Sequence, residues 1–139
     1  MPMASNGKKP NGWKNRHFYQ ALRYAVIGLI TAYQEERNVR FHTLAVILVV
    51  VLGRLFNLSG SEWLWIILAV FSVLSSEIWN SALENVVDLA TGGKRHPLAK
   101  KAKDMAAGAV LLAAIFALIV AAVIFLPKFY QLIYWREVF

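Results

Sequence analysis

One uninterrupted apolar segment, residues 105–126, most restricts the folds open to this chain. It contains only Met, Ala, Gly, Val, Leu, Ile and Phe. A helix rises about 1.5 Å per residue, so about 22 apolar residues are enough to cross a hydrocarbon core of roughly 30 Å. The segment therefore predicts a transmembrane helix.

Two further apolar segments predict two more membrane-spanning helices. Residues 41–58 form the first, in which Arg54 can extend its charged end to the nearby interface. Residues 63–83 form the second, and only residues 59–62 separate the two, which indicates a tight hairpin turn. The chain has 139 residues, of which 58% are hydrophobic, against about 45–50% in soluble domains. We therefore expect one all-α integral membrane domain over residues 1–139.

The residues before these spans form a different kind of unit. Apolar residues recur at intervals of three and four over residues 16–36, and the opposite face is polar with a basic start. This pattern predicts an amphipathic helix that lies in the cytoplasmic interface or packs on the end of the helix bundle, and the two positions do not exclude each other. Residues 1–15 are polar and predict a flexible tail. The chain has no cysteine, which excludes a disulfide framework and thiolate chemistry.

The basic residues predict how the spans are oriented. Seven of the 15 Lys and Arg residues lie before residue 41, and five lie between residues 94 and 103. Because positive residues gather on the cytoplasmic side, we expect the amino terminus and the loop 89–104 in the cytoplasm, and the hairpin and the carboxyl terminus outside. The aromatic belt expected at the outer interface consists of Tyr130, Tyr134 and Trp135.

A polar stripe interrupts the end of the span at residues 63–83. It consists of Glu77, Asn80, Glu84 and Asp88. At about 100° per residue, these spacings return to within roughly 60° of the start, so the four side chains share one helix face. Carboxylates in a bilayer are costly and indicate a functional site. Counted from the outer end of the span, Glu77 falls near the inner edge of the hydrocarbon, and the later carboxylates lie at or beyond the headgroups. The stripe thus predicts a metal-and-base site at the membrane surface.

Other charged residues add to this predicted site. Mg²⁺ usually binds one or two protein carboxylates together with substrate phosphates. Glu84 provides one carboxylate, and the pair Glu35-Glu36, at the end of the amphipathic helix, provides a second source. The loop 89–104 adds Lys103-Asp104 and further cationic side chains, which fit a bound polyphosphate.

Each of these residues also has a purely structural interpretation. Asp88 is then a solvated helix end, and Glu77 is neutralised by Arg23 or Arg40. The loop lysines then serve only membrane topology and attraction to anionic lipid. Surface or interface positions are expected for His17 and His42.

The stripe is also part of a longer pattern. Residues 77–88 read E-x-x-N-x-A-x-E-x-x-V-D, and His96 and the run Ala102-Lys103-Asp104-Met105 follow. This pattern resembles the prokaryotic diacylglycerol kinase family, which are small membrane lipid kinases with three spans and an amphipathic surface helix. The resemblance covers nearly the whole chain. Residues 28–42 and 96–111 resemble the Gram-positive branch of that family, which is similar to undecaprenol kinases.

The resemblance implies a homotrimer in the bacterial inner membrane, with active sites between subunits on the cytoplasmic side. It implies that Glu77 is the general base for the lipid hydroxyl and that Asn80 helps to position the phosphoryl group. It also implies that Glu36 and Glu84 bind Mg²⁺ together with the phosphates of ATP. The residues implied to contact ATP are Tyr24, Glu36, Glu84, Arg95, His96, Lys103 and Asp104. Residues 92–95 depart from the family's pattern.

We therefore expect ATP- and Mg²⁺-dependent phosphorylation of a membrane lipid alcohol, with undecaprenol ahead of diacylglycerol as the substrate. Two other classes of function stay open. One is a non-enzymatic ion or proton path lined by Glu77, Asn80 and Glu84, and the other is a scaffold whose basic loop recruits anionic lipid. The expected partners are ATP, the lipid alcohol, the bilayer and further copies of the chain, with no nucleic acid.

Overall fold

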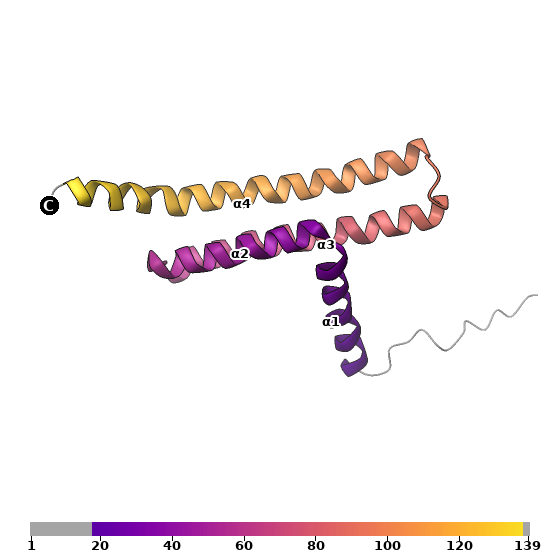
Figure 1. Ribbon diagram of the computed structural model, residues 1–139, viewed down its shortest axis with the longest axis horizontal. Helices are drawn as coiled ribbons and strands as arrows, with labels where there is room; N and C mark the ends of the chain where they lie inside the picture. The colour runs from indigo at the N-terminus through magenta and orange to yellow at the C-terminus, as the bar shows by residue number, and fades with distance from the viewer. Residues whose placement is uncertain (1–17, 138–139) are drawn as a thin grey trace, which may run out of the picture.

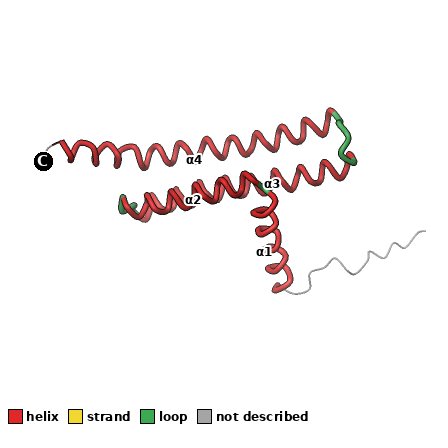
Figure 2. The backbone as a smooth tube through the Cα atoms, in the orientation of Figure 1, coloured by secondary structure: helices red, strands yellow, loops and turns green. Residues whose placement is uncertain are grey.

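Four helices form the part of the chain that the structure, a computed structural model, describes, residues 18–137 (Figure 1). They are α1 (Phe18–Glu35), α2 (Arg37–Leu55), α3 (Gly60–Thr91) and α4 (Pro97–Glu137). Short loops connect them, and these described residues contain no strand (Figure 2). The helices α2, α3 and α4 are each long and apolar enough to cross a membrane. The predicted all-α class, with three spans and an additional amino-terminal helix, is therefore confirmed.

The helices extend beyond the segments that the apolar pattern marks. The helix α3 has 32 residues and α4 has 41, so they measure about 48 Å and about 62 Å, against roughly 30 Å of hydrocarbon. Both helices therefore continue past the hydrocarbon. The predicted tail of residues 1–15, the first two residues of the predicted amphipathic segment and the side chain of Trp135 lie outside the described residues.

Polar caps decide where α3 begins and ends. At its start, the Ser59 hydroxyl accepts a hydrogen bond from the Glu62 backbone N–H at 3.3 Å, and the Glu62 carboxylate accepts one from the Ser59 N–H at 2.7 Å. This reciprocal capping box satisfies two backbone donors that would otherwise lack partners. At its end, Gly92 adopts the left-handed conformation, with a φ of 59°, which commonly terminates helices. The helix therefore runs through the polar stripe without a break.

The helices α3 and α4 lie side by side and form most of the core with the end of α2 (Figure 1). The buried apolar cluster consists of Leu58, Ile66, Ala69, Val120, Ile124 and Phe125. At the hairpin end, the Lys128 ammonium of α4 lies 3.0 Å from the Glu62 carboxylate of α3. Many other apolar side chains are exposed, which suits a surface that faces lipid tails as apolar as the side chains themselves.

The helix α1 runs across the direction of the other three helices (Figure 1). Glu36, in an extended conformation, makes the corner between α1 and α2. Arg40 of α2 fixes this corner, because its guanidinium donates hydrogen bonds to the carbonyl oxygens of Tyr33 at 3.3 Å and Gln34 at 2.7 Å. Both carbonyls belong to the last turn of α1, where such groups lack partners within the helix. No residue of α1 is buried, so its apolar face is available to the membrane interface.

In the hairpin between α2 and α3, the Trp63 side chain of α3 packs against Gly53 of α2. This residue is buried, and a Cβ atom placed on it would lie 2.6 Å from Cη2 and 2.8 Å from Cζ2 of Trp63. The Trp63 ring therefore packs directly on the backbone of α2, as small residues allow between membrane helices. The Arg54 guanidinium lies 5.9 Å from the centre of the same ring, within the range of a cation–π contact.

This close approach makes a prediction about stability. Replacing glycine by alanine inside a helix normally gains about 1 kcal/mol of helix propensity. We expect Gly53→Ala to lower the thermal stability of the purified protein in detergent nonetheless, because the added methyl group displaces the Trp63 ring. Gly28→Ala is the matched control, since a Cβ there meets no atom within 4 Å. Equal rises in Tm for both variants would contradict the close packing.

Candidate functional site

The polar stripe on α3 changes from buried to exposed along its length. Glu77 is 3% exposed and Ser81, one turn later, is 9% exposed. Asn80 and Glu84 are half-buried, and Asp88 is exposed. Because the helix rises about 1.5 Å per residue, Glu77 and Asp88 lie about 16 Å apart along its axis. One helix face therefore connects the interior of the bundle to its surface.

Glu77 is paired with a histidine of the neighbouring helix. The Nε2 atom of His42, on α2, lies 3.2 Å from Oε1 of Glu77. The His42 side chain is 23% exposed, so it is half-buried between the helices rather than on the open surface, and the interface position that the sequence also allowed stays a prediction. Arg40, which the sequence offered as a partner for Glu77, is engaged instead with the carbonyl oxygens at the end of α1. A carboxylate this deeply buried needs such a partner, because an unpaired buried charge is strongly unfavourable.

Asn80 and Glu84 form the next pair along the stripe. The Asn80 amide Nδ2 donates a hydrogen bond to Oε1 of Glu84 at 2.9 Å. The other amide atom, Oδ1 of Asn80, is buried and has no hydrogen-bond partner among the residues that the structure describes. A buried acceptor is nearly always satisfied in a working protein. The amide oxygen is therefore a candidate contact for a bound cation or donor.

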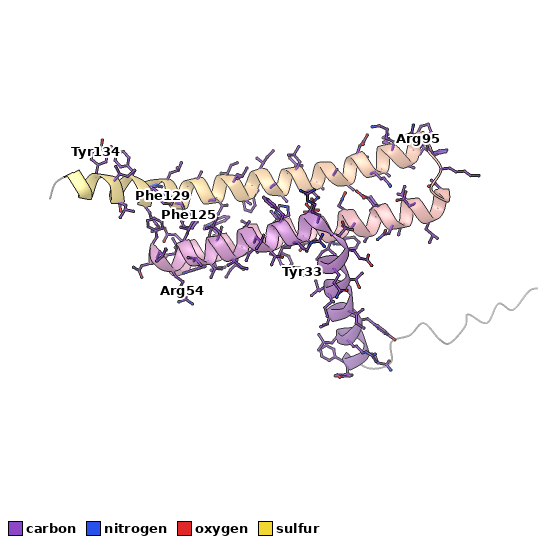
Figure 3. The ribbon with its side chains drawn as sticks, in the orientation of Figure 1. Tyr33, Arg54, Arg95, Phe125, Phe129 and Tyr134 are labelled. Carbon is purple, nitrogen blue, oxygen red and sulfur yellow. The ribbon has the colours of Figure 1, made fainter. Side chains whose placement is uncertain are left out.

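A polar pocket of about 740 Å³ lies where α3 ends and α4 begins. This volume is in the range of about 300–1,000 Å³ that small-molecule sites occupy. Its charged and titratable lining consists of Asp88, Lys94, Arg95, His96, Lys100, Lys103 and Asp104. Arg95 lies at the end of the α3–α4 pair where the loop joins the two helices (Figure 3). The predicted residues Arg95, His96, Lys103 and Asp104 are thus brought to one place.

Asp88 pairs with Lys103, one of the three lysines that line this pocket. The Lys103 ammonium lies 2.7 Å from Oδ1 and 2.8 Å from Oδ2 of Asp88, which joins α3 to α4. Lys100 and Asp104 form a second ion pair one turn apart on α4. The exposed Asp88 carboxylate is therefore ion-paired as well as solvated, and its partner is the lysine that the family resemblance places among the ATP contacts.

Two glycines and a histidine shape the loop that carries the basic residues. Gly92 and Gly93 have positive φ values of 59° and 73°, which glycine adopts without steric strain. The Gly93 N–H donates to the Asp88 carbonyl oxygen at 3.1 Å, which closes the end of α3. His96 Nδ1 accepts a hydrogen bond from the Leu98 N–H at 3.2 Å, and this caps the start of α4. One ring nitrogen of His96 therefore has a structural role.

Two residues that were predicted to contact ATP or the metal, Tyr24 and Glu36, do not line this pocket. Tyr24 lies on α1 and is 59% exposed. Glu36 is half-buried at the start of α2, where its side chain makes no capping hydrogen bond. Over the described side chains, no group of three or more His, Asp or Glu residues is placed to hold a metal ion. The structure gathers the loop residues around the pocket and pairs Asn80 with Glu84, and the pocket lining does not include Tyr24 or Glu36.

The pairing of His42 with Glu77 and of Asp88 with Lys103 was not predicted from the sequence. Each pair joins residues far apart in the chain, so helical spacing alone contains no signal for it. A weaker signal existed, since His42 is a polar residue inside an apolar span. The structure therefore adds His42 to the candidate site, and it gives Asp88, already part of the stripe, a partner in Lys103.

The chain is similar to known proteins over most of its length. Residues 23–125 match the model of a family described as prokaryotic diacylglycerol kinase. An undecaprenol kinase of Bacillus subtilis is 43% identical over 111 residues, which are 80% of this chain and 89% of that protein. A diacylglycerol kinase of Synechocystis is 39% identical over 132 residues, which are 94% of this chain and 75% of that protein. A diacylglycerol kinase of Escherichia coli K12 is 38% identical over 100 residues, which are 72% of this chain and 81% of that protein.

The pocket makes a prediction about anion binding. Lys103 lines the pocket and Lys101 does not, although the two lie on the same turn of α4. A hydrogen bond to a charged group contributes about 1.5–3 kcal/mol, so we expect Lys103→Met to weaken the binding of ATP by about 10- to 100-fold. Lys101→Met is the control and should change Kd less than about threefold. Calorimetric titration in detergent measures both, and equal losses would show that only the total charge of the loop matters.

Proposed function

The chain belongs to the prokaryotic diacylglycerol kinase family and is a membrane lipid kinase, and on this basis we propose that it phosphorylates undecaprenol with ATP, with Glu77 as the general base. The observation that carries this proposal is the position of Glu77. It is a buried carboxylate on a helix face that leads to a polar pocket, and the length of the span is expected to put it near the inner edge of the hydrocarbon. A lipid kinase needs this arrangement, because one substrate lies in the membrane and the other in water.

In the proposed reaction, the proton of the lipid hydroxyl moves to the Glu77 carboxylate, and the alcohol oxygen forms a bond to the γ-phosphorus of ATP. The bond from that phosphorus to the β,γ-bridging oxygen breaks, and its electron pair leaves with ADP. A positioned base contributes about 10²–10⁴-fold to such a rate. The remainder of the acceleration comes from positioning and charge stabilisation, which dominate phosphoryl transfer. Asn80, one turn from Glu77, is placed to help in that positioning.

ATP is proposed to bind in the polar pocket between α3 and α4. The pocket contains Arg95 and Lys103, whose side chains donate to phosphate oxygens. The ion pair between Lys103 and Asp88 keeps the ammonium group near the end of the stripe. His96 and Asp104 line the same pocket and are proposed to contact the nucleotide.

A divalent metal accompanies ATP in this proposal, and we assign it as Mg²⁺. Asn80, whose Oδ1 atom has no hydrogen-bond partner among the described residues, and Glu84 lie one turn apart on α3 and both carry oxygen atoms, and Mg²⁺ prefers oxygen ligands. The residues therefore fit the metal. Glu84 would hold it with the phosphates of ATP, and Glu36 would add the second carboxylate. A bound Mg²⁺ ion supplies positive charge that stabilises the transferring phosphate.

We also propose that three copies of the chain form the functional unit, with each site completed by a neighbour. Tyr24 lies on α1, which extends away from the α3–α4 pair (Figure 1), and Tyr33 of α1 is well separated from Arg95 of the pocket (Figure 3). A neighbouring copy would bring Tyr24 to the pocket. The proposed site faces the cytoplasm, with the amino terminus and residues 89–104 on that side of the bacterial inner membrane and the carboxyl terminus outside.

Glu77→Gln tests the assignment of the base. The variant keeps the size and a hydrogen-bonding group but cannot accept the proton, so we expect kcat to fall by about 10²–10⁴-fold with the Kd of ATP largely unchanged. Release of radiolabelled lipid phosphate and calorimetric ATP titration give the two quantities. Glu62→Gln, at the other end of the same helix, is the control and should retain turnover.

The same variant distinguishes the kinase from an ion or proton path. A path would give persistent conductance in liposomes that depends on Glu77, with no ATP turnover by the native protein. Near-normal lipid phosphorylation by Glu77→Gln would remove Glu77 from the role of base.

A panel of lipid alcohols tests the substrate. The 43% identity to the undecaprenol kinase of Bacillus subtilis supports undecaprenol as the substrate of this chain, whereas the diacylglycerol kinase of Synechocystis aligns with 94% of the chain and supports diacylglycerol. We expect a higher kcat/KM for undecaprenol than for diacylglycerol when both are presented in the same mixed micelles. A higher kcat/KM for diacylglycerol would assign the chain to the second activity.

A further inference from the structure

The base proposed for this reaction has one side-chain partner among the described residues, and that partner is His42. The Glu77 carboxylate is almost completely buried, and Nε2 of His42 lies 3.2 Å from its Oε1 atom. The buried Ser81 hydroxyl donates a hydrogen bond to the backbone carbonyl oxygen of Glu77 at 3.1 Å, so it makes no hydrogen bond with the Glu77 carboxylate. The orientation of the carboxylate therefore depends on His42.

His42 is itself held in place. On one side of His42, the ring of Phe41 meets the imidazole edge-on, with 5.7 Å between the ring centres. On the other side, the Thr43 hydroxyl donates a hydrogen bond to the Val39 carbonyl oxygen of the same helix. The His42 ring also lines a small apolar cavity of about 100 Å³ between α2, α3 and α4. Apolar surroundings strengthen a hydrogen bond between an imidazole and a carboxylate, because water does not compete for either group.

Resting on the proposed function, we propose that His42 is the positioning residue of the general base. With its proton on Nε2, the imidazole donates to Oε1 and fixes the rotamer of Glu77, so that the second oxygen, Oε2, takes the proton of the lipid hydroxyl. The transition state is sensitive to this geometry, since a displacement of about 1 Å can reduce a rate by about 10²-fold. His42 touches neither ATP nor the phosphoryl group in this proposal and acts only through Glu77.

Replacing His42 by Asn or by Gln separates its role in positioning Glu77 from the effects of side-chain size and polarity. The Gln side-chain nitrogen reaches about as far as Nε2 of histidine, whereas the Asn nitrogen falls short by about one bond. We expect His42→Asn to lower kcat by about 10- to 100-fold, with the KM values for ATP and lipid changed less than about threefold. His42→Gln should recover most of that loss. Thr43→Val, on the next residue, is the control for local disturbance of α2 and should leave kcat within about twofold.

The combination with Glu77→Gln tests whether His42 acts through the base. In the Glu77→Gln background, His42→Asn should have almost no further effect, because residues that act as a unit are not additive. Unchanged ATP affinity and Tm for the single variants show that the fold is intact. If His42→Asn unfolds, His42→Gln is compared with His42→Leu in its place.

Three results would overturn the inference. They are a His42→Asn kcat within twofold of the native value, a His42→Gln variant as slow as His42→Asn, and a full additional loss in the double variant. A failure of the proposed function looks different, because Glu77→Gln alone would then retain turnover. An inactive Glu77→Gln with a fully active His42→Asn would reject the role of His42 and leave the base in place.

Discussion

The structure depends on one helix that crosses the hydrocarbon and continues on the far side without a break. In α3, residues from Trp63 to Leu83 are enough to cross the membrane, yet the helix persists to Thr91. A continuous helix fixes the spacing and the direction of its side chains. The stripe from Glu77 to Asp88 therefore holds its groups at set depths, which no loop at the membrane surface would do. α4 supports this arrangement, since it packs along α3 and meets it again through the Asp88–Lys103 ion pair.

Each carboxylate of the stripe has a partner suited to its depth. Glu77, the deepest, meets an imidazole, Glu84 meets the amide of Asn80, and Asp88, at the surface, meets a lysine. A fully charged ammonium group near Glu77 would carry a larger desolvation penalty than an imidazole, which can be neutral. The partners therefore change from an imidazole and an amide along the buried and half-buried part of the stripe to a lysine ammonium at its exposed end. Each of the three carboxylates has a hydrogen-bonding or ion-pairing side chain beside it.

Helical periodicity and hydropathy were sufficient to predict the class of the fold and the shared face of the stripe, because both depend on local spacing. The ends of α3 were harder, since the Ser59–Glu62 capping box and the left-handed Gly92 decide them rather than hydropathy. The partners of the stripe were harder still. His42 and Lys103 reach it from α2 and α4, and the direction of a side chain between packed helices depends on how those helices are rotated. The loop residues came together as predicted because they are neighbours in sequence.

The corner at Arg40 links α1, which is expected to lie along the membrane surface, to α2, which is expected to cross the membrane. α1 presents an apolar face, and an amphipathic helix of this kind is held at the boundary between headgroups and acyl chains. Arg40 clamps the last turn of α1 to α2, two residues before His42. An interfacial α1 would therefore fix the depth at which α2 enters the membrane. In a bilayer of different thickness, α2 and α3 would tilt to match the hydrocarbon, while His42 and Glu77, which lie near this corner, would keep a nearly constant distance from the headgroups.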